Sequence, residues 1–211
     1  MTHYDFLCIE GNIGAGKTTL SKMIAEEFNA RLILEQFEDN SFLPKFYEDP
    51  DKYAFPLELS FLAERFQQLK AELTAHDLFR SFTVSDYFIN KSLIFARSTL
   101  KDDEYALFNK LFSIILPNLP KPNLIVFLHA GVDRLQQNIQ KRGRVYEQKI
   151  MDEYLLKIQD AYLAYLRTQK DMKVLIINTE NIDFVNIPEH YTKIKEIIFS
   201  DYPIGITRFS I

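Results

Sequence analysis

Cysteine is nearly absent from this chain of 211 residues, in which Cys8 is the only one. An internal disulfide is therefore excluded, and because Cys8 lies in an apolar run we expect it to pack as a small buried hydrophobic side chain. The chain also lacks an apolar run of membrane-spanning length, and an apolar run that begins at Tyr4 leaves no room for a signal peptide. These features predict a cytoplasmic protein with no membrane partner.

An excess of positive charge is absent too, since 25 Lys and Arg stand against 29 Asp and Glu, for a net charge of −4. A nucleic-acid partner is therefore not expected, whereas a small phosphorylated or phosphate-accepting ligand is compatible with this balance. We find no internal repeat, low-complexity segment or linker, and 47% of the residues are apolar. The sequence thus predicts a single domain over residues 1–211.

A phosphate-binding loop dominates the N-terminal part. A short apolar run precedes the sequence GNIGAGKT, which fits the pattern G-x-x-x-x-G-K-[ST], and apolar residues at helical spacing follow it up to Phe28. In this context backbone N–H groups can surround phosphate oxygens, Lys17 can reach the β- and γ-phosphates, and the Thr18 hydroxyl can bind Mg²⁺. The predicted ATP-binding residues of the loop are Gly11, Asn12, Ile13, Gly14, Ala15, Gly16, Lys17, Thr18 and Thr19.

Five short apolar runs alternate with helical patterns along the whole chain. The predicted strands are Tyr4–Ile9, Arg31–Glu35, Phe82–Ser85, Leu124–Leu128 and Val174–Asn178. The predicted helices are Lys17–Phe28, Leu57–Ala75, Tyr87–Arg97, Asp102–Leu116, Gly131–Gln140, Lys149–Thr168 and Pro188–Phe199. This order predicts an α/β fold of the P-loop kinase type, with a five-stranded parallel sheet flanked by helices on both faces. The tail from Ser200 receives no assignment.

One carboxylate, Glu35, ends the second predicted strand, and another, Asp86, follows the third. Glu35 and Asp86 should therefore lie at the same sheet edge as the phosphate loop, where ligands of such sheets bind. Glu35 could accept a hydroxyl proton during phosphoryl transfer, or it could be a strand-end charge that meets solvent. Asp86 could hold Mg²⁺, and it could also cap a helix that begins at Tyr87.

A basic turn, Lys141-Arg142-Gly143-Arg144, follows the helix after the fourth strand. With a phosphate loop in the same chain, it predicts a short lid over residues 140–149, in which Arg142 and Arg144 bind ATP and stabilise the charge that develops during transfer. The alternative is a helix C-terminus that carries favourable cations.

The chain resembles the deoxynucleoside kinases over nearly its whole length, and in particular the bacterial deoxyguanosine and deoxyadenosine kinase branch. The phosphate loop is common to many families, but the order and spacing of the other segments are specific. These segments are Leu34–Pro50, Phe55–Leu69, Ser85–Ala96, Leu119–Leu128 and Gln140–Ile150.

The resemblance implies roles for single residues. Glu35 matches the glutamate that takes the proton of the nucleoside 5′-hydroxyl, and Tyr47 and Glu147 match the pair that binds the sugar 3′-hydroxyl. Glu58 stands where many members read the base edge with glutamine, while Asn178–Asp183 would contact the donor adenine. The resemblance further implies a homodimer paired through the helices near Leu57–Ala75 and Asp102–Leu116, and inhibition by a triphosphate end product.

Three positions depart from many relatives, although the purine-type bacterial branch shares the Asp-Tyr of the first. Asp86-Tyr87-Phe88 lacks the arginine that many relatives carry after the third strand. That arginine would steady the nucleoside 5′-oxygen, so a lid arginine would take over this role or the role would go unfilled. Glu58 replaces glutamine. An ionised carboxylate only accepts hydrogen bonds, so it suits the N1–H and N2–H₂ donors of guanine. Adenine offers such a carboxylate only its N6 donors, unless Glu58 is protonated. An exposed helix charge at Glu58 is the alternative. Asn40 stands where pyrimidine-preferring members carry a bulky tryptophan, and it would leave space for a purine.

Together these features predict an enzyme that uses ATP and Mg²⁺ to phosphorylate the 5′-hydroxyl of deoxyadenosine, deoxyguanosine or both, for nucleotide salvage. One alternative is a nucleoside-monophosphate kinase or another small-molecule kinase of this fold, although the region of Tyr47 and Glu58 is acidic and aromatic rather than basic. The other alternative is a nucleotide-dependent switch that acts on a protein partner. Against it, Asp86 leads directly into an apolar segment instead of an Asp-x-x-Gly motif.

Overall fold

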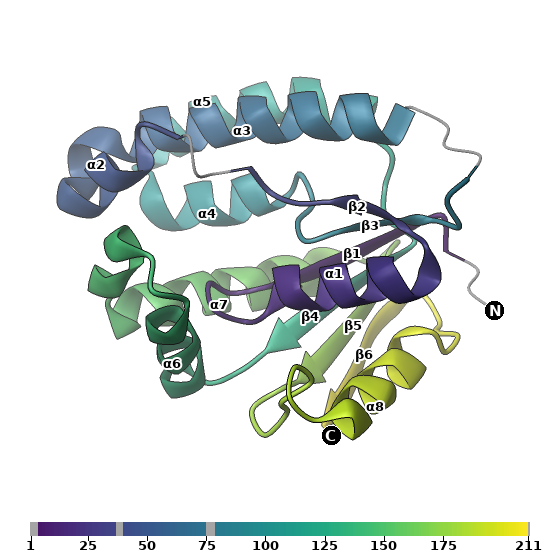
Figure 1. Cartoon of the computed structure of the whole chain (residues 1–211). Coiled ribbons are helices and arrows are strands. Elements are labelled where there is room, and N and C mark those ends of the chain that lie inside the picture. Colours follow the sequence, from purple (N-terminus) through teal and green to yellow (C-terminus); the bar gives the residue numbers. More distant parts are fainter. Residues whose placement is uncertain (1–3, 37–39, 75–78, 211) are drawn as a thin grey trace.

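A six-stranded parallel sheet forms the centre of the protein in the computed structural model, which describes residues 4–36, 40–74 and 79–210. The strands are β1 (Phe6–Gly11), β2 (Arg31–Ile33), β3 (Thr83–Ser85), β4 (Leu124–His129), β5 (Lys173–Asn178) and β6 (Gly205–Ser210). Their spatial order is β2-β3-β1-β4-β5-β6, and every neighbouring pair is parallel (Figure 1). β1, which carries the phosphate loop, thus lies between β3 and β4 in the interior of the sheet.

Helices cover both faces of this sheet, as the α/β prediction requires (Figure 1). The helices are α1 (Lys17–Phe28), α2 (Leu43–Glu48), α3 (Pro50–Thr74), α4 (Lys91–Thr99), α5 (Asp102–Ile115), α6 (Val132–Arg142), α7 (Asp152–Thr168) and α8 (Pro188–Ile198). Two 3-10 helices cover Leu116–Asn118 and Val145–Lys149.

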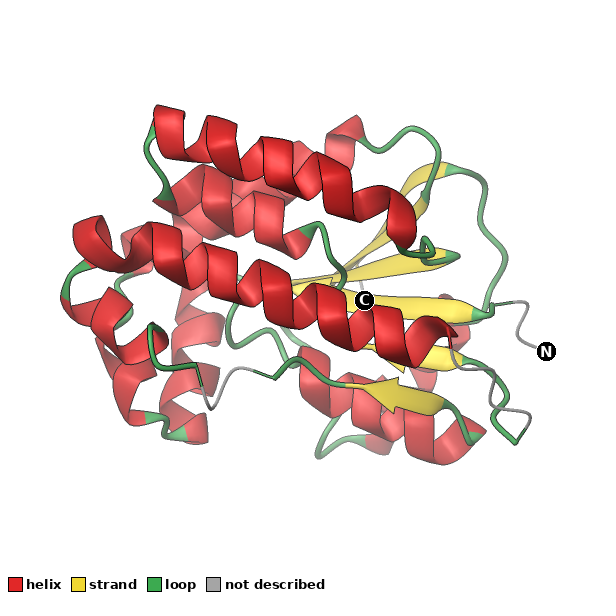
Figure 2. Ribbon diagram, turned by 90° about the horizontal axis from the view of Figure 1, so that it is seen from above, coloured by secondary structure: helices red, strands yellow, loops and turns green. Residues whose placement is uncertain are grey.

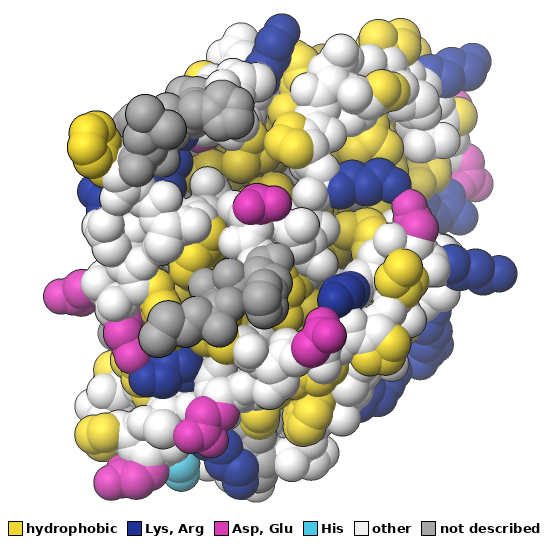
Figure 3. Space-filling model, turned by 90° about the vertical axis from the view of Figure 1, so that its right-hand side faces the viewer, with side chains coloured by type: hydrophobic (Ala, Val, Ile, Leu, Met, Phe, Trp, Pro, Cys, Tyr) yellow, Lys and Arg dark blue, Asp and Glu magenta, His cyan; other side chains and the backbone are white. Residues whose placement is uncertain are grey.

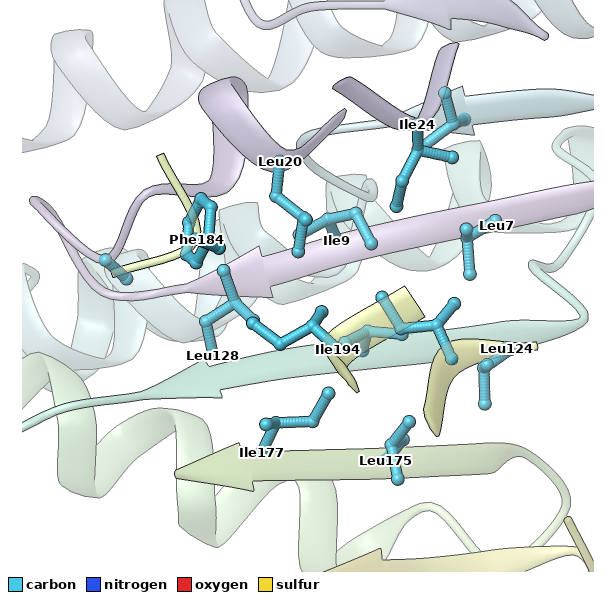
Figure 4. Packing of buried hydrophobic residues seen from close by; sticks show 14 of the residues in the cluster. Leu7, Ile9, Leu20, Ile24, Leu124, Leu128, Leu175, Ile177, Phe184 and Ile194 are labelled. Carbon is cyan, nitrogen blue, oxygen red and sulfur yellow. The ribbon is translucent and has the colours of Figure 1, made fainter. Parts of the chain in front are cut away.

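Alternate residues of each central strand pack on opposite faces of the sheet. On one face Leu7 and Ile9 of β1 contact a core that α1 and α8 complete with Leu20, Ile24 and Ile194 (Figure 4). On the other face lie Cys8, Ile125 and Phe127, together with side chains of α4 and α7. Cys8 is fully buried there, as the sequence predicted. Burial on both faces explains why these strands read as continuous apolar runs.

A second layer of helices lies beyond α4. α3 and α5 run next to one another above the sheet (Figure 2), and they pack on α4 through Leu62 and Leu69 of α3 and Phe108 and Phe112 of α5. This layer matters for the site because α3 and α4 present polar side chains to the carboxyl ends of the strands.

The number of strands was predicted wrongly, since the sheet has six strands and not five. Gly205–Ser210, within the tail that received no assignment, pairs with β5 along its whole length, with Ile206 beside Val174. Its side chains alternate between half-buried and exposed, which is the pattern of an edge strand and is weaker than that of the central strands.

Three helix starts also differ from the sequence expectation. α3 begins at Pro50 and continues through Pro56, because the apolar cluster of Ala54, Leu57 and Phe61 outweighs the one backbone hydrogen bond that a proline removes. α4 begins at Lys91, so that no helix starts at Tyr87. α7 begins at Asp152, after the 3-10 helix that ends at Lys149.

The strands direct their carboxyl ends toward the end of the molecule where α2 and α6 lie (Figure 1). The other end, seen in Figure 3, carries acidic and basic side chains close together among apolar ones. Within the part of the chain that the structure describes, no helix combines the length and apolar character needed to cross a membrane.

Candidate active site

Two cavities open at the carboxyl ends of the strands. The larger, which we call the donor cavity, has a volume of about 520 Å³ and runs from the phosphate loop to the segment after β5. The smaller, the acceptor cavity, has a volume of about 100 Å³ and lies between β2, α3, α4 and the lid. Of the residues that the structure describes, four line both cavities: Lys17, Thr18, Arg142 and Arg144. The two cavities therefore meet at a group of cations beside the phosphate loop.

The phosphate loop requires glycine where its backbone turns. Gly14 has φ +82°, and a Cβ there would lie 2.6 Å from the carbonyl oxygen of Leu135. Gly16 has φ +90°, and a Cβ there would lie 2.9 Å from the ring of Phe184. Both the torsions and the lack of space exclude a side chain. The loop thus keeps its backbone open to the donor cavity, as the sequence motif predicted.

Gly11 and Asn12 support this loop and line neither cavity. The side-chain amide of Asn12 donates to the carbonyl of Leu155 at 2.8 Å, and its oxygen accepts the N–H of Ile13 at 2.8 Å. The other predicted loop residues line a cavity, Ile13 on the acceptor side and Gly14, Ala15, Gly16 and Thr19 on the donor side.

Lys17 is half-buried among charges of both signs. Its Nζ donates to the carbonyl of Asn12 at 2.9 Å. Burial lowers the pKa of Lys17 to about 8, Lys91 adds to this effect, and the nearby carboxylates of Glu10 and Glu35 oppose it. A phosphate group in the donor cavity would satisfy this ammonium better than a single carbonyl does.

Asp86 and Thr18 lie in contact at the end of β3. The Thr18 hydroxyl donates to one carboxylate oxygen of Asp86 at 2.5 Å, and the N–H of Glu35 donates to the other at 2.8 Å. Asp86 therefore links the phosphate loop to the end of β2. It caps no helix at Tyr87, since α4 begins four residues later, at Lys91.

The Thr18 and Asp86 oxygens fit a magnesium ion. Mg²⁺ prefers oxygen ligands, and in nucleotide sites it is held by one or two protein oxygens together with phosphate oxygens and water. A hydroxyl and a carboxylate beside the phosphate loop match that donor set.

Glu35 lies between two cations. Its carboxylate accepts hydrogen bonds from Arg65 Nε at 2.8 Å and from Lys91 Nζ at 2.5 Å, and its side chain is 11% exposed. Burial alone would raise the pKa of Glu35, but the charges and hydrogen bonds of Lys91 and Arg65 together outweigh burial and lower the pKa to about 2. Glu35 is thus ionised at neutral pH, and the alternative of a charge that simply meets solvent is wrong.

Arg65 and Lys91 were not identified from the sequence. Both line the acceptor cavity, and the guanidinium of Arg65 also donates to the Ser92 hydroxyl at 2.8 Å. The basic groups at Glu35 therefore come from α3 and α4. For the missing arginine, whose role is to steady the 5′-oxygen, the sequence had suggested only a lid arginine or no replacement. The available signal was the absence of arginine from Asp86-Tyr87-Phe88, which leaves a place for another cation.

Glu58 lies at the apolar part of the acceptor cavity, with Leu57, Phe61 and Tyr154. Only 2% of Glu58 is exposed, so the alternative of an exposed helix charge is wrong. One of its oxygens accepts the hydroxyl of Thr99 at 3.0 Å. Burial is the main cause that raises the pKa of Glu58, to about 7. Such a carboxyl can be neutral or ionised near neutral pH.

The lid residues meet at Glu147. Its carboxylate, which is buried, forms ion pairs with Arg142 and with Arg144, the latter at 3.3 Å. Tyr47 stacks on Tyr146, with ring centroids 6.2 Å apart, and burial raises the pKa of Tyr47. Tyr47 and Glu147 both line the acceptor cavity, so the predicted partners of a sugar hydroxyl lie on the same side of it as the lid arginines. Arg142 is also the last residue of α6, as the helix-terminus alternative expects.

The outer part of the donor cavity is formed by the segment after β5. Thr179, Ile182 and Asp183 from the predicted adenine-contacting segment line it, followed by Phe184 and its neighbours up to Asn186. Phe184 also packs against Gly16. The cavity thus extends from the phosphate loop to a partly apolar region that can accommodate a nucleobase.

Some polar residues are buried near the site without lining either cavity, among them Asn40 and Glu10. Asn40, predicted to leave room for a purine, donates to the Ser60 hydroxyl at 2.7 Å and accepts the N–H of Phe42. Glu10, which the sequence analysis did not single out, accepts the hydroxyl of Tyr162 at 2.9 Å. Both therefore act as structural supports of the site.

Comparisons with known proteins relate the chain to one family and one fold. The family model "Deoxynucleoside kinase" matches residues 7–201. The chain is 37% identical to the deoxyguanosine kinase of Bacillus subtilis over 202 residues, covering 92% of this chain and 97% of the relative. It is 36% identical to the deoxyguanosine kinase of Lactobacillus johnsonii, covering 78% of this chain and 74% of that relative. The fold is similar to that of deoxyadenosine kinase from M. mycoides with bound dATP, with a TM-score of 0.78, 21% identity and coverage of 92% and 100% of the two chains.

Proposed function

Because this chain belongs to the deoxynucleoside kinase family, it is a phosphotransferase that acts on deoxynucleosides, and we propose that its acceptors are the purine 2′-deoxyribonucleosides. In the reaction the γ-phosphoryl group of ATP forms a bond to the 5′-oxygen, the bond to the β-phosphate oxygen breaks, and ADP leaves. The names of the relatives support deoxyguanosine first and deoxyadenosine second.

The observation that carries this proposal is the junction of the two cavities. ATP in the donor cavity would direct its γ-phosphate toward Lys17 and Thr18, and a nucleoside in the acceptor cavity would direct its 5′-hydroxyl toward the same point. Arg142 and Arg144 line both cavities and supply positive charge where the transferring group gains negative charge. Positioning and electrostatic stabilisation are what phosphoryl transfer demands of a protein.

Glu35 is the proposed acceptor of the 5′-hydroxyl proton. The low pKa of Glu35 makes it a weak base. Because the transition state of phosphoryl transfer is loose, however, the 5′-hydroxyl loses its proton late, and Glu35 is needed chiefly to orient it. Arg65 and Lys91 keep Glu35 ionised and fix its direction. Tyr47 and Glu147 are proposed to bind the sugar, and Glu58 the base.

Magnesium is the proposed cofactor. Thr18 and Asp86 would hold it, and Mg²⁺ would supply charge neutralisation of the donor phosphates. With the ion bound, the Asp86 carboxylate would contact Mg²⁺ instead of accepting the hydrogen bond from the Thr18 hydroxyl. We also propose that the protein acts in the cytoplasm as a homodimer paired through α3 and α5.

Phosphoryl transfer from γ-labelled ATP to a panel of acceptors tests the proposal. The panel contains the four natural deoxynucleosides, the ribonucleosides and the deoxynucleoside monophosphates, each at several concentrations. We expect deoxyguanosine and deoxyadenosine to be phosphorylated with the highest kcat/KM. Transfer only to monophosphates would instead identify a nucleoside-monophosphate kinase, and slow ATP hydrolysis unaffected by any acceptor would favour a nucleotide-dependent switch.

A further inference from the structure

Glu58 has one oxygen without a partner. Oε2 is buried and forms no hydrogen bond with any described residue, while Oε1 accepts the hydroxyl of Thr99 at 3.0 Å. A buried polar atom left unpaired costs free energy, so such an atom in a binding cavity is expected to find its partner in the ligand. Because Glu58 lines the acceptor cavity, this partner would belong to the nucleoside.

The helix spacing places Glu58 at the base and not at the 5′-hydroxyl. Arg65 and Lys91 meet at Glu35, whereas Glu58, earlier on α3, meets Thr99 at the end of α4, so α3 and α4 run antiparallel. Seven residues along α3 separate Glu58 from Arg65, which is about 10 Å along a helix axis. That is about the span from the 5′-oxygen of a nucleoside to the far edge of its base. Leu57, Phe61 and Tyr154 supply the apolar surface that a base requires.

The groups around Glu58 come from several elements. On its own helix Arg65 lowers the pKa, and on α4 the Thr99 hydroxyl and Lys91 lower it as well. Glu35, after β2, raises it, and the phenols of Tyr47 on α2 and Tyr154 on α7 also interact with the carboxyl. Burial outweighs the cations, and the pKa of about 7 lies within the range in which an enzyme works.

We infer that the protonation state of Glu58 decides which purine the site accepts: the ionised carboxylate selects guanine, and the neutral carboxyl accepts either base. The inference rests on the proposed function. A carboxylate can accept both N1–H and the 2-amino group of guanine, but opposite adenine one oxygen would face the N1 lone pair. A neutral carboxyl donates its proton to adenine N1 and accepts from the 6-amino group. It can also pair with the N1–H and O6 of guanine.

The test is the ratio of kcat/KM for deoxyguanosine to kcat/KM for deoxyadenosine between about pH 5.5 and about pH 8, a window that contains the pKa of about 7. Neither base titrates in this window, and the titration of groups that act on both substrates cancels in the ratio. We expect the ratio to fall by about tenfold or more toward acid pH. A constant ratio in the unmodified protein would overturn the inference without the need for any variant.

Three variants assign the effect to Glu58. Glu58→Gln, an isosteric neutral side chain, should give a low ratio that no longer depends on pH. Thr99→Val should move the transition to higher pH, because the Thr99 hydroxyl lowers the pKa of Glu58. Glu64→Gln is the matched control, since Glu64 lies on the same helix, is exposed and does not line the cavity.

The outcomes separate the inference from the proposed function. If the ratio still depends on pH in Glu58→Gln, or no longer depends on pH in Glu64→Gln, another group sets the selectivity. Either result would overturn the inference and leave deoxynucleoside phosphorylation in place. A protein that phosphorylates neither purine deoxynucleoside at any pH would refute the proposed function, and the inference with it.

Discussion

Glu35 illustrates how the site works at the scale of single residues. Replacement of Glu35 by Gln keeps the shape of the side chain but removes the charge that pairs with two cations and that we propose accepts the proton. We expect the rate of phosphoryl transfer to fall by about 10²- to 10⁴-fold, with nucleoside and ATP still bound. Single-turnover kinetics and calorimetric titration measure the two effects separately.

The control for this variant is its thermal unfolding, since Arg65 and Lys91 lose part of their charge compensation. Rates are therefore compared at a temperature where both proteins are folded. A variant that is fully folded and transfers phosphate at a near-normal rate would contradict the role of Glu35.

Lys91 determines the pH range in which Glu35 remains ionised. Lys91→Met removes a charge and a hydrogen bond that both lower the pKa of Glu35, so that pKa should rise from about 2. In the proposed role a protonated Glu35 cannot accept the 5′-hydroxyl proton, so the acid limb of the kcat/KM profile should move to higher pH. Lys91→Arg retains the charge and should leave the limb near its original place. An unchanged acid limb in Lys91→Met would show that Lys91 has no influence on the base.

The positions of the site residues were predictable to different degrees. Glu35 and Asp86 could be placed because each follows an apolar strand directly, and strand ends of a parallel sheet share one edge. Arg65 and Lys91 could not, since their positions depend on how α3 packs on α4, which no local pattern encodes. The burial of Glu58 could not be predicted for the same reason.

At the scale of elements, the phosphate loop depends on glycine at the positions where its backbone turns. Gly14→Ala would combine a positive φ, which costs about 1–2 kcal/mol, with an overlap against the Leu135 carbonyl that costs about 1–3 kcal/mol more. Gly143→Ala is the matched control, because Gly143 has φ +75° but nothing within 4 Å of a Cβ. Urea unfolding of the two variants measures the difference. Equal losses of stability would mean that the loop can relax around the overlap.

Element types followed from the sequence more reliably than element bounds. Strong apolar periodicity identified α1 and β4, whereas the start of α3 was placed seven residues late because Pro56 reads as a helix boundary. In the folded protein the contacts of Leu57 and Phe61 override that local signal. The first turn of α4 was misplaced because nothing in Tyr87 to Asn90 marks a start.

At the scale of the whole molecule, the sixth strand extends the sheet on the side away from the phosphate loop. Gly205–Ser210 pairs only with β5, at the edge of the sheet. Half-buried and exposed side chains alternate along it, but its apolar residues Ile206 and Phe209 are three positions apart, so the sequence of this short run shows no strand-like alternation. The parallel sheet itself could be predicted from the alternation of strands and helices.

Exposed apolar side chains on α5 provide a test of the proposed homodimer. Leu107 and Ile114, seven residues apart on one helix face, are 51% and 72% exposed. The double replacement Leu107→Asp with Ile114→Asp should produce monomers in sedimentation or light-scattering measurements. Leu156→Asp on α7, where the leucine is 49% exposed, is the matched control and should leave the dimer intact. An unmodified protein that is monomeric at all concentrations would refute the dimer.

The central claim is that the two cavities form one site of transfer at Lys17, Thr18, Arg142 and Arg144. A bisubstrate analogue, in which adenosine and deoxyguanosine are joined through their 5′-oxygens by a polyphosphate chain, tests it most directly. If the cavities meet as described, the analogue inhibits competitively against both ATP and deoxyguanosine and binds more tightly than either substrate. Competition against ATP alone, with no effect of the deoxyguanosine half on affinity, would contradict the account.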